Sequence, residues 1–226
     1  MLIDMKMRLI LCTPFLLLFV SCFQLIEDVT VKQDGSGTAV FTANLSQSRS
    51  KLASIMLLDS VNGYKVPSKT DIQNHLAEIA TELKKIPGIS NVSHSADFDK
   101  FIATIRFSFN KVEDLNTIAN KLFTEMKITS SNQSSYAYNK GGRTFSRTYV
   151  YEPKAKAEFE KLKDADKEVF NSATYTSIYR FDQPVLSQSN ASAKLAASKK
   201  AVMMQSPILD LITGKRNMTN QIKLAN

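Results

Sequence analysis

The stretch "ISNVSHSADFDKFIATIRFSFN", residues 89–110, decides the fold because it predicts two strands, the turn between them and the start of a helix. Apolar side chains at alternate positions share one face of the second strand, namely Phe101, Ile105, Phe107 and Phe109. Asp97 and Asp99, within residues 97–100, predict a tight turn before that strand. Asn110 is a favourable helix N-cap, with Glu113 and Asp114 in the first turn after it. A hairpin followed by an amphipathic helix predicts a sheet with helices on one face.

Two further hairpins are predicted on either side of this stretch. Residues 24–33 and 38–45 alternate apolar and polar positions around the turn "DGSG" at residues 34–37. Residues 136–151 repeat this pattern around a turn at 139–142. Both hairpins are expected to add antiparallel strands to the protein.

The segment "TDIQNHLAEIATELKKI", residues 70–86, places apolar side chains at steps of three and four, which predicts an amphipathic helix. Thr70 and Gln73 fit a capping box at its start, and Pro87 with Gly88 ends it. Less regular patterns predict helices at 46–58, 153–170 and 207–213, strands at 174–181 and 220–225, and a hairpin over 192–205.

These patterns predict an α+β fold with mainly antiparallel hairpins and amphipathic helices packed on one face. A chain of 226 residues is long enough for one compact domain, and we expect residues 22–226 to form it. The composition, 43% hydrophobic and 22% charged, is typical of an ordinary folded protein.

Cysteine and charge limit the classes of site that the domain can hold. The two cysteines are Cys12 and Cys22, so the sequence after Cys22 has no disulfide and no thiolate metal site. The formal net charge is +8, and the basic residues are scattered. Scattered lysines favour solubility, and attraction to anionic headgroups or acidic glycans is the alternative. We expect no nucleic-acid partner.

The amino terminus has the three parts of a secretory signal. Lys6 and Arg8 precede the apolar stretch "LILCTPFLLLFV", residues 9–20, which is followed by the small residue Ser21. A helix that spans a bilayer needs about 20 apolar residues, so this stretch is short for a span. Residues 1–21 are therefore interpreted as a signal peptide, with an uncleaved anchor as the alternative.

The segment "FVSC", residues 19–22, resembles the lipobox of bacterial lipoproteins. Val20 and Ser21 fit the two positions before the cysteine, whereas Phe19 stands where the family usually has leucine. The resemblance implies cleavage between Ser21 and Cys22 and attachment of a diacylglyceryl group to Cys22. The alternative is an unmodified thiol after an ordinary signal peptide.

The same resemblance leads to an expected location in the cell envelope. No aspartate directly follows Cys22, and aspartate there is the inner-membrane retention signal of some lipoproteins. We therefore expect an outer-membrane anchor with the domain facing the periplasm. Glu27 and Asp28 leave display on the cell surface as an alternative. The segment 175–190 also resembles uncharacterised bacterial lipoproteins, a likeness that implies no activity.

Residues suited to catalysis or metal binding are sparse. The chain has no Gly-x-Ser-x-Gly elbow and no pairing of a catalytic cysteine with histidine. His75 is expected to be solvated on the polar side of its helix. His94 with Asp97 and Asp99 is the one cluster suited to zinc or manganese, but turn chemistry explains both aspartates. We expect no catalytic residue, no metal and no cofactor.

The hairpin at 136–151 carries the candidate ligand-binding face. Rings that can stack on sugars and guanidinium groups that can pair with anions alternate along it: Tyr136, Tyr138, Arg143, Phe145, Arg147 and Tyr149. The alternative is that the rings pack under a helix while the arginine stems reach toward water.

The sequence thus favours a membrane-anchored, non-catalytic bacterial lipoprotein that binds a partner protein or an envelope component such as a glycan. An envelope hydrolase acting on glycan or peptide is one alternative, and a surface adhesin or assembly subunit is another. The missing nucleophile and base weigh against the hydrolase.

Overall fold

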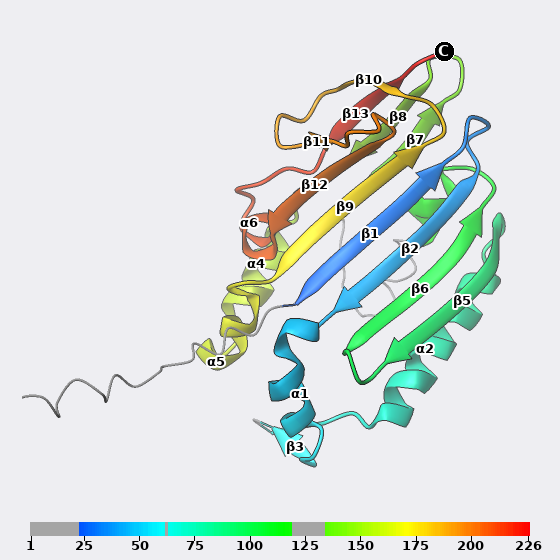
Figure 1. Ribbon diagram of the computed structural model, residues 1–226. Helices are drawn as coiled ribbons and strands as arrows, with labels where there is room; N and C mark the ends of the chain where they lie inside the picture. Colours follow the sequence, from blue (N-terminus) through cyan, green and yellow to red (C-terminus); the bar gives the residue numbers. More distant parts are fainter. Residues whose placement is uncertain (1–22, 62, 119–133) are drawn as a thin grey trace, which may run out of the picture.

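The computed structural model of the protein describes residues 23–61, 63–118 and 134–226 (Figure 1). It confirms the predicted α+β class, with mainly antiparallel strands. The predicted cleavage and lipidation residues, Ser21 and Cys22, lie outside the described residues, as does the later part of the helix predicted after Asn110.

The larger of the two main sheets has seven strands. Their order across the sheet is β11 (Lys194–Leu195), β12 (Ala201–Pro207), β9 (Thr174–Phe181), β1 (Gln24–Val31), β2 (Gly37–Asn44), β6 (Ile102–Phe109) and β5 (Ile89–Asp97). Neighbouring strands are antiparallel except β1 and β9, which are parallel. The hairpins predicted at 24–45, 89–109 and 192–205 are confirmed, and all three belong to this sheet.

The second sheet has four strands, in the order β10 (Val185–Gln188), β13 (Asn220–Leu224), β8 (Thr144–Thr148) and β7 (Ser135–Asn139). It contains the hairpin predicted at 136–151, which turns between Asn139 and Thr144. A two-stranded ribbon of β3 (Ser60–Val61) and β4 (Tyr64–Lys65) stands apart from both sheets.

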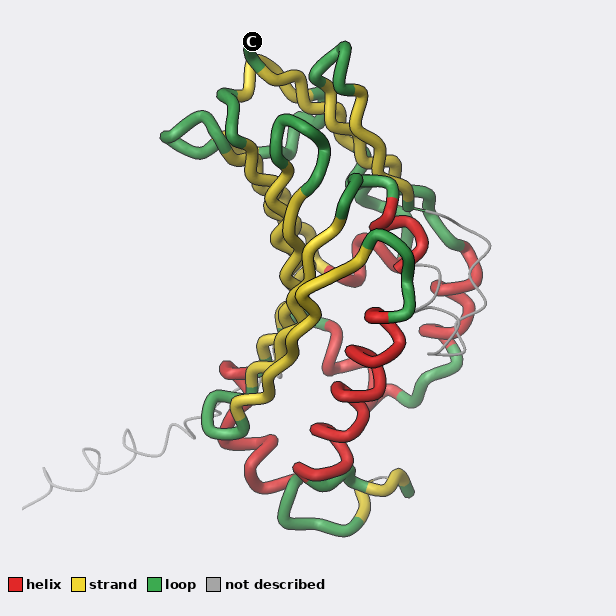
Figure 2. The backbone as a smooth tube through the Cα atoms, turned by 90° about the vertical axis from the view of Figure 1, so that its right-hand side faces the viewer, coloured by secondary structure: helices red, strands yellow, loops and turns green. Residues whose placement is uncertain are grey.

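Helices connect and cover these strands. Their bounds are η1 (Ser46–Ser48), α1 (Arg49–Ile55), α2 (Lys69–Lys84), α4 (Pro153–Glu160), α5 (Asp164–Lys167), η2 (Glu168–Phe170) and α6 (Ile208–Ile212), and residues 114–118 are also helical. In Figure 2, α2 and the four-stranded sheet lie on the same side of the seven-stranded sheet. The single helix predicted over 153–170 is wrong, because the chain leaves the helix at Leu162 and Lys163 before α5 begins.

The start of α2 differs from the predicted one. Ser68 is the N-cap, its hydroxyl accepts the backbone N–H of Asp71, and the Asp71 carboxylate accepts the N–H of Ser68. The capping box therefore begins two residues before Thr70, and the predicted pair of Thr70 and Gln73 is wrong. Aspartate plays the part that glutamate or glutamine usually plays at the third helical position.

The inner face of the seven-stranded sheet is completely covered at one end. Strand register aligns two rows of side chains across β6, β2, β1 and β9, which we call the closed half: Phe107, Ala39, Val29 and Tyr179, and then Phe109, Gly37, Val31 and Phe181. All eight are buried. Phe145 of the four-stranded sheet packs on this half, with its ring centroid 4.8 Å from that of Tyr179. Packing is so close that a Cβ at Gly37 would lie 1.9 Å from the Thr30 carbonyl oxygen.

The other end of the same face is only partly covered. There the register aligns Ala103, Ala43, Leu25 and Tyr175, a row that we call the open half. Leu25 is 39% exposed although it points to the core side of β1, and Ala103, Ala43 and Tyr175 are half-buried. The same four strands thus contribute both to a closely packed core and to an apolar surface that solvent reaches.

Candidate functional site

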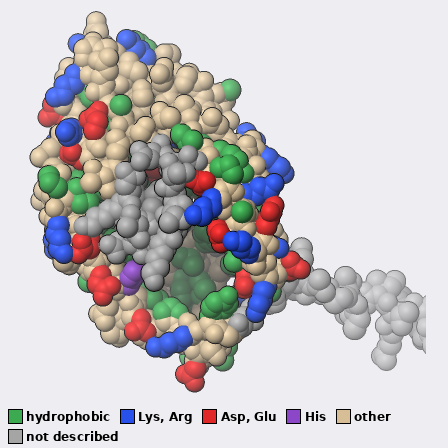
Figure 3. Space-filling model, turned by 180° about the vertical axis from the view of Figure 1, so that it is seen from behind, with side chains coloured by type: hydrophobic (Ala, Val, Ile, Leu, Met, Phe, Trp, Pro, Cys, Tyr) green, Lys and Arg blue, Asp and Glu red, His purple; other side chains and the backbone are tan. Residues whose placement is uncertain are grey.

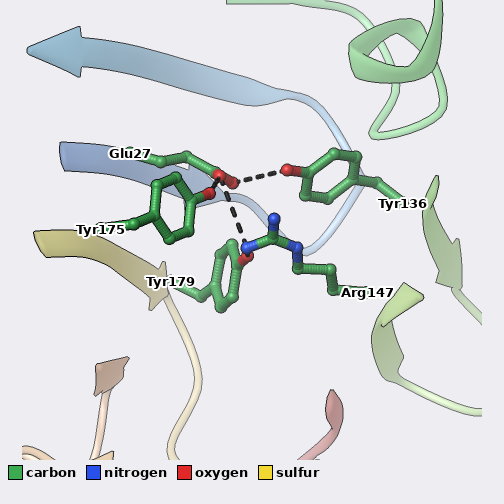
Figure 4. A network of polar contacts seen from close by, with 5 residues as sticks. All are labelled: Glu27, Tyr136, Arg147, Tyr175 and Tyr179. Carbon is green, nitrogen blue, oxygen red and sulfur yellow. Dashed lines mark hydrogen bonds and ion pairs between the residues drawn. The ribbon is translucent and has the colours of Figure 1, made fainter. Parts of the chain in front are cut away.

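A network of polar side chains lies between the closed half and the open half (Figure 4). The hydroxyl of Tyr136 donates to Oε1 of Glu27 at 2.9 Å, and the hydroxyl of Tyr175 donates to Oε2. Nη1 of Arg147 donates to the Tyr179 hydroxyl oxygen at 2.9 Å and lies 3.6 Å from Oε2 of Glu27. Two strands of the large sheet, β1 and β9, and both strands of the 135–148 hairpin meet here.

Four of the five side chains of the network are buried and Tyr175 is half-buried, and the two charges of the network compensate each other. Glu27 and Arg147 are buried, and the guanidinium carbon of Arg147 lies 5.6 Å from the ring centroid of Tyr136 and 5.3 Å from that of Tyr175. The negative faces of the two rings therefore stabilise the cation that pairs with Glu27. Burial raises the pKa values of Tyr136, Tyr175 and Tyr179 well above the ordinary tyrosine value, and attraction to Arg147 opposes the increase. All three hydroxyls remain protonated near neutral pH, so those of Tyr136 and Tyr175 donate to Glu27.

The candidate ligand-binding face is largely part of this interior. Tyr136, Tyr138, Phe145 and Arg147 are buried, so they form no open surface. Their burial follows from the packing of the four-stranded sheet on β9, and Arg147 avoids an uncompensated charge because Glu27 lies opposite.

The other two residues of that face lie at its ends. Nη1 of Arg143 donates to the backbone carbonyl of Ala225 and to the Asn226 side chain. The hydroxyl of half-buried Tyr149 donates to the carbonyl oxygen of Leu211 at 3.2 Å. Both side chains therefore bond to the protein itself.

An apolar cavity of about 200 Å³ opens beside the open half. Residues of α1, α2, the β5–β6 hairpin and the segments next to the two helices line it: Leu45, Leu52, Ile55, Met56, Val66, Pro67, Ile72, Ala96, Asp97, Phe98, Phe101, Ile102 and Ala103. Twelve of these thirteen are apolar, and the carboxylate of the remaining one, Asp97, accepts the backbone N–H groups of Asp99 and Lys100. In Figure 3, hydrophobic side chains line a hollow in the lower half of the molecule, and charged side chains surround it.

A more polar cavity of about 390 Å³ adjoins the apolar one and shares Met56, Phe98 and Phe101 with it. Arg49, Ser68, Lys69 and Asp99 are among its other lining residues. The Lys69 ammonium lies 5.5 Å from the centroid of the Phe98 ring. An apolar interior with charged groups at its mouth suits a ligand that is apolar at one end.

The histidine cluster of the sequence does not form a metal site. Within residues 23–61, 63–118 and 134–226, no three His, Cys, Asp or Glu side chains are placed to hold one metal ion. Nδ1 of His75 lies 3.6 Å from the carboxylate of Glu78 on the exposed side of α2. The helices of the described chain include none that is both long and apolar enough to cross a membrane.

Glu27 and the cavity were not predicted from the sequence. The position of Glu27 in its strand does, however, contain a signal that predicts its burial. Glu27 alternates with Leu25, Val29 and Val31, so its side chain is on the core face of β1. An acidic residue in such a position predicts a buried partner. The cavity has no comparable signal, because it depends on how α1 and α2 cover the sheet.

The fold and the site together define an α+β protein with an apolar cavity at one end of its main sheet. No protein-family model and no curated protein matches the chain. Among solved structures, the NMR structure of the folded domain of the Mycobacterium tuberculosis LppM protein is similar, with a TM-score of 0.44 and 12% sequence identity. The alignment covers 89% of this chain and 88% of that one. The chemistry of the site is therefore inferred from the residues of the site alone.

Proposed function

We propose that the protein is a non-catalytic, lipid-anchored protein of the bacterial cell envelope and that its cavity binds an apolar group of an envelope component. The apolar cavity between α1, α2 and the β5–β6 hairpin carries this proposal. It supports the binding of an acyl chain better than the binding of a glycan, because a glycan requires polar partners throughout.

The size and lining of the cavity fit such a ligand. Apolar cavities of about 150 Å³ stay dry and accept small apolar molecules, and this one measures about 200 Å³. Each methylene group that moves from water into it contributes about 0.8 kcal/mol. A chain end of a few carbons would therefore bind measurably, while the polar part of the molecule stays at the mouth.

The lipid anchor is supported by the resemblance of residues 19–22 to a lipobox, and the non-catalytic role by the missing nucleophile and base motifs. The outer membrane, with the domain facing the periplasm, is the proposed location. A partner protein that inserts an apolar side chain is the other occupant that the cavity would accept.

Photo-crosslinking in intact cells tests the ligand. Cells that produce the full chain are given a fatty acid with a diazirine in its acyl chain and are then illuminated. We expect crosslinks on peptides that contain residues 52–56 and 101–103. Ala103→Phe, which fills the cavity, should lower these crosslinks at least fivefold.

Ala137→Phe is the matched control, because Ala137 is exposed on β7 and lies away from the cavity. It should leave the crosslinks unchanged. Crosslinks spread evenly over the chain, or equally strong in Ala103→Phe, would refute the cavity as the binding site.

The anchor is tested without illumination. A clickable fatty acid should label the wild-type chain and fail to label Cys22→Ala. Equal labelling of the two chains would reject lipidation at Cys22 and would leave the cavity proposal standing.

A further inference from the structure

Three large apolar side chains project into solvent from the segment that joins α1 to α2. Leu57 is 86% exposed, Leu58 is 54% exposed and Tyr64 is 64% exposed. We call these three residues the tip. A soluble surface tolerates single exposed apolar residues, but a group of them marks an interaction site.

Backbone hydrogen bonds hold the described residues of this segment, on both sides of residue 62, so the exposure of the three side chains is part of the fold. The N–H groups of Leu57 and Leu58 donate to the carbonyl oxygens of Ser54 and Ile55. Tyr64 pairs with Val61 in the β3–β4 ribbon, and the N–H of Val66 donates to the carbonyl of Asp59 at 3.0 Å, which closes the loop.

The tip lies at the end of the molecule from which a lipid anchor would emerge. Gln24, at the start of β1, pairs with Asn44, and the chain passes from Asn44 through η1 into α1 (Figure 1). Cys22 precedes Gln24 by two residues, so it can lie at most about 7 Å from the start of β1. Helix α1, with seven residues, extends about 10 Å. The tip therefore lies beyond the ends of the strands, at the end of the sheet where β1 starts and the anchor would be attached.

The tip also adjoins the cavity. Leu57 and Met56 line the polar cavity, and Met56 lines the apolar one as well. Leu57 of the tip is therefore part of the wall of the polar cavity, which in turn adjoins the apolar one.

The charges around the tip suit a membrane surface. Residues 49–71 contain four basic side chains, Arg49, Lys51, Lys65 and Lys69, and two acidic ones, Asp59 and Asp71. The Asp71 carboxylate is already engaged in the capping box with Ser68. Basic side chains beside exposed leucine and tyrosine are typical of segments that rest in the headgroup layer of a bilayer.

We propose that the tip inserts into the headgroup layer of the membrane that holds the anchor, so that the cavity mouth opens toward the lipid. The inference rests on the proposed anchoring. It adds a second, noncovalent contact, which fixes the orientation of the domain on the bilayer.

The chain contains no tryptophan, so one introduced tryptophan reports on one place. The full chain with Tyr64→Trp, isolated from membranes, is reconstituted into vesicles of phosphatidylcholine and phosphatidylglycerol that contain brominated phosphatidylcholine. Bromine in the upper acyl chain should quench the fluorescence at least twofold, and the emission should shift to shorter wavelength.

Leu186→Trp is the matched control, because Leu186 is 66% exposed on β10 in the other sheet. We expect no quenching there. Adding Leu57→Ser and Leu58→Ser to the Tyr64→Trp chain should reduce quenching to the level of the control.

Two results would overturn the proposal. Equal quenching of Tyr64→Trp and Leu186→Trp would show that the tip has no preferred contact with lipid. A shift of the emission without quenching by bromine would show that a protein surface covers the tip. Cosedimentation of the wild-type chain with vesicles is scored separately, so a failure of the anchor is distinguished from a failure of the tip.

Discussion

The closed half and the open half of the large sheet are built from the same four strands, yet they differ in what covers them. Phe145 from the four-stranded sheet packs on Tyr179 and Phe181 over the closed half, and within the sheet Thr30 and Phe109 leave no room for a Cβ at Gly37. Over the open half, α1 and α2 leave a cavity of about 200 Å³. Apolar alternation along a strand therefore specifies a face that avoids water, but it does not specify the element that covers the face.

The two halves also separate stability from binding. Buried apolar side chains in close contact stabilise the fold, and each methylene group removed from the closed half lowers the free energy of unfolding. Half-buried side chains around a cavity contribute less to folding, and they retain apolar surface for a ligand. The polar network of Glu27 and Arg147 lies between the two halves.

Removal of Arg147 should have the largest effect on this division. Arg147→Met leaves the Glu27 carboxylate buried without its cation, and we expect the free energy of unfolding to fall by about 3–5 kcal/mol. Urea unfolding followed by circular dichroism measures the loss.

Arg180→Met is the control for that loss. Arg180 forms a two-pronged ion pair with Asp28 at 2.9 Å, but its side chain is half exposed, and such surface pairs contribute about 1 kcal/mol or less. Equal losses in the two variants would contradict the enclosed character of the network.

Replacing one alanine in each half by leucine sharpens the comparison. Ala39→Leu in the closed half has no room, and overpacking should lower the free energy of unfolding by about 1–3 kcal/mol. Ala103→Leu in the open half enters the cavity, and we expect a change close to zero or a small gain. Thermal unfolding of both chains under identical conditions decides this, and a larger loss in Ala103→Leu would mean that the cavity is filled.

The smallest expected effect is a pH dependence confined to alkaline solution. The pKa of Tyr136 is raised in the folded protein, so folding holds its proton more tightly than the unfolded chain does. The resulting stability is complete below about pH 10 and is lost as the pH rises, by about 1.4 kcal/mol per pH unit for each such tyrosine. Tyr136→Phe should reduce the slope of unfolding free energy against pH between 10 and 11.5. Tyr64→Phe, at an exposed position, should leave the slope as in the wild type.

Local elements of the fold were predictable from the sequence because their signals are local. Alternation identified the strands at 89–109 and 174–181, and steps of three and four identified α2. The helix at 153–170 was wrong at its middle, where Leu162 and Lys163 leave the helix although the apolar spacing continues through them.

Long-range contacts account for the misses. In the sequence alone, Arg147 has the character of a surface residue. In the folded protein it is paired with Glu27, which belongs to a strand more than one hundred residues earlier. The candidate ligand-binding face on the 135–148 hairpin became core for that reason. The cavity depends on three separate segments that meet only in the folded chain, so no single stretch of sequence indicates it.

The parallel pairing of β1 with β9 places Gln24 beside Thr174. During synthesis, β1 and β2 are made early and can pair, but the other hydrogen-bonding edge of β1 has no partner until residues 174–181 have been made. Contacts between such distant residues slow folding, and an open strand edge invites aggregation in the meantime. A chaperone that protects strand edges would therefore matter most in the interval between the synthesis of β1 and the synthesis of β9.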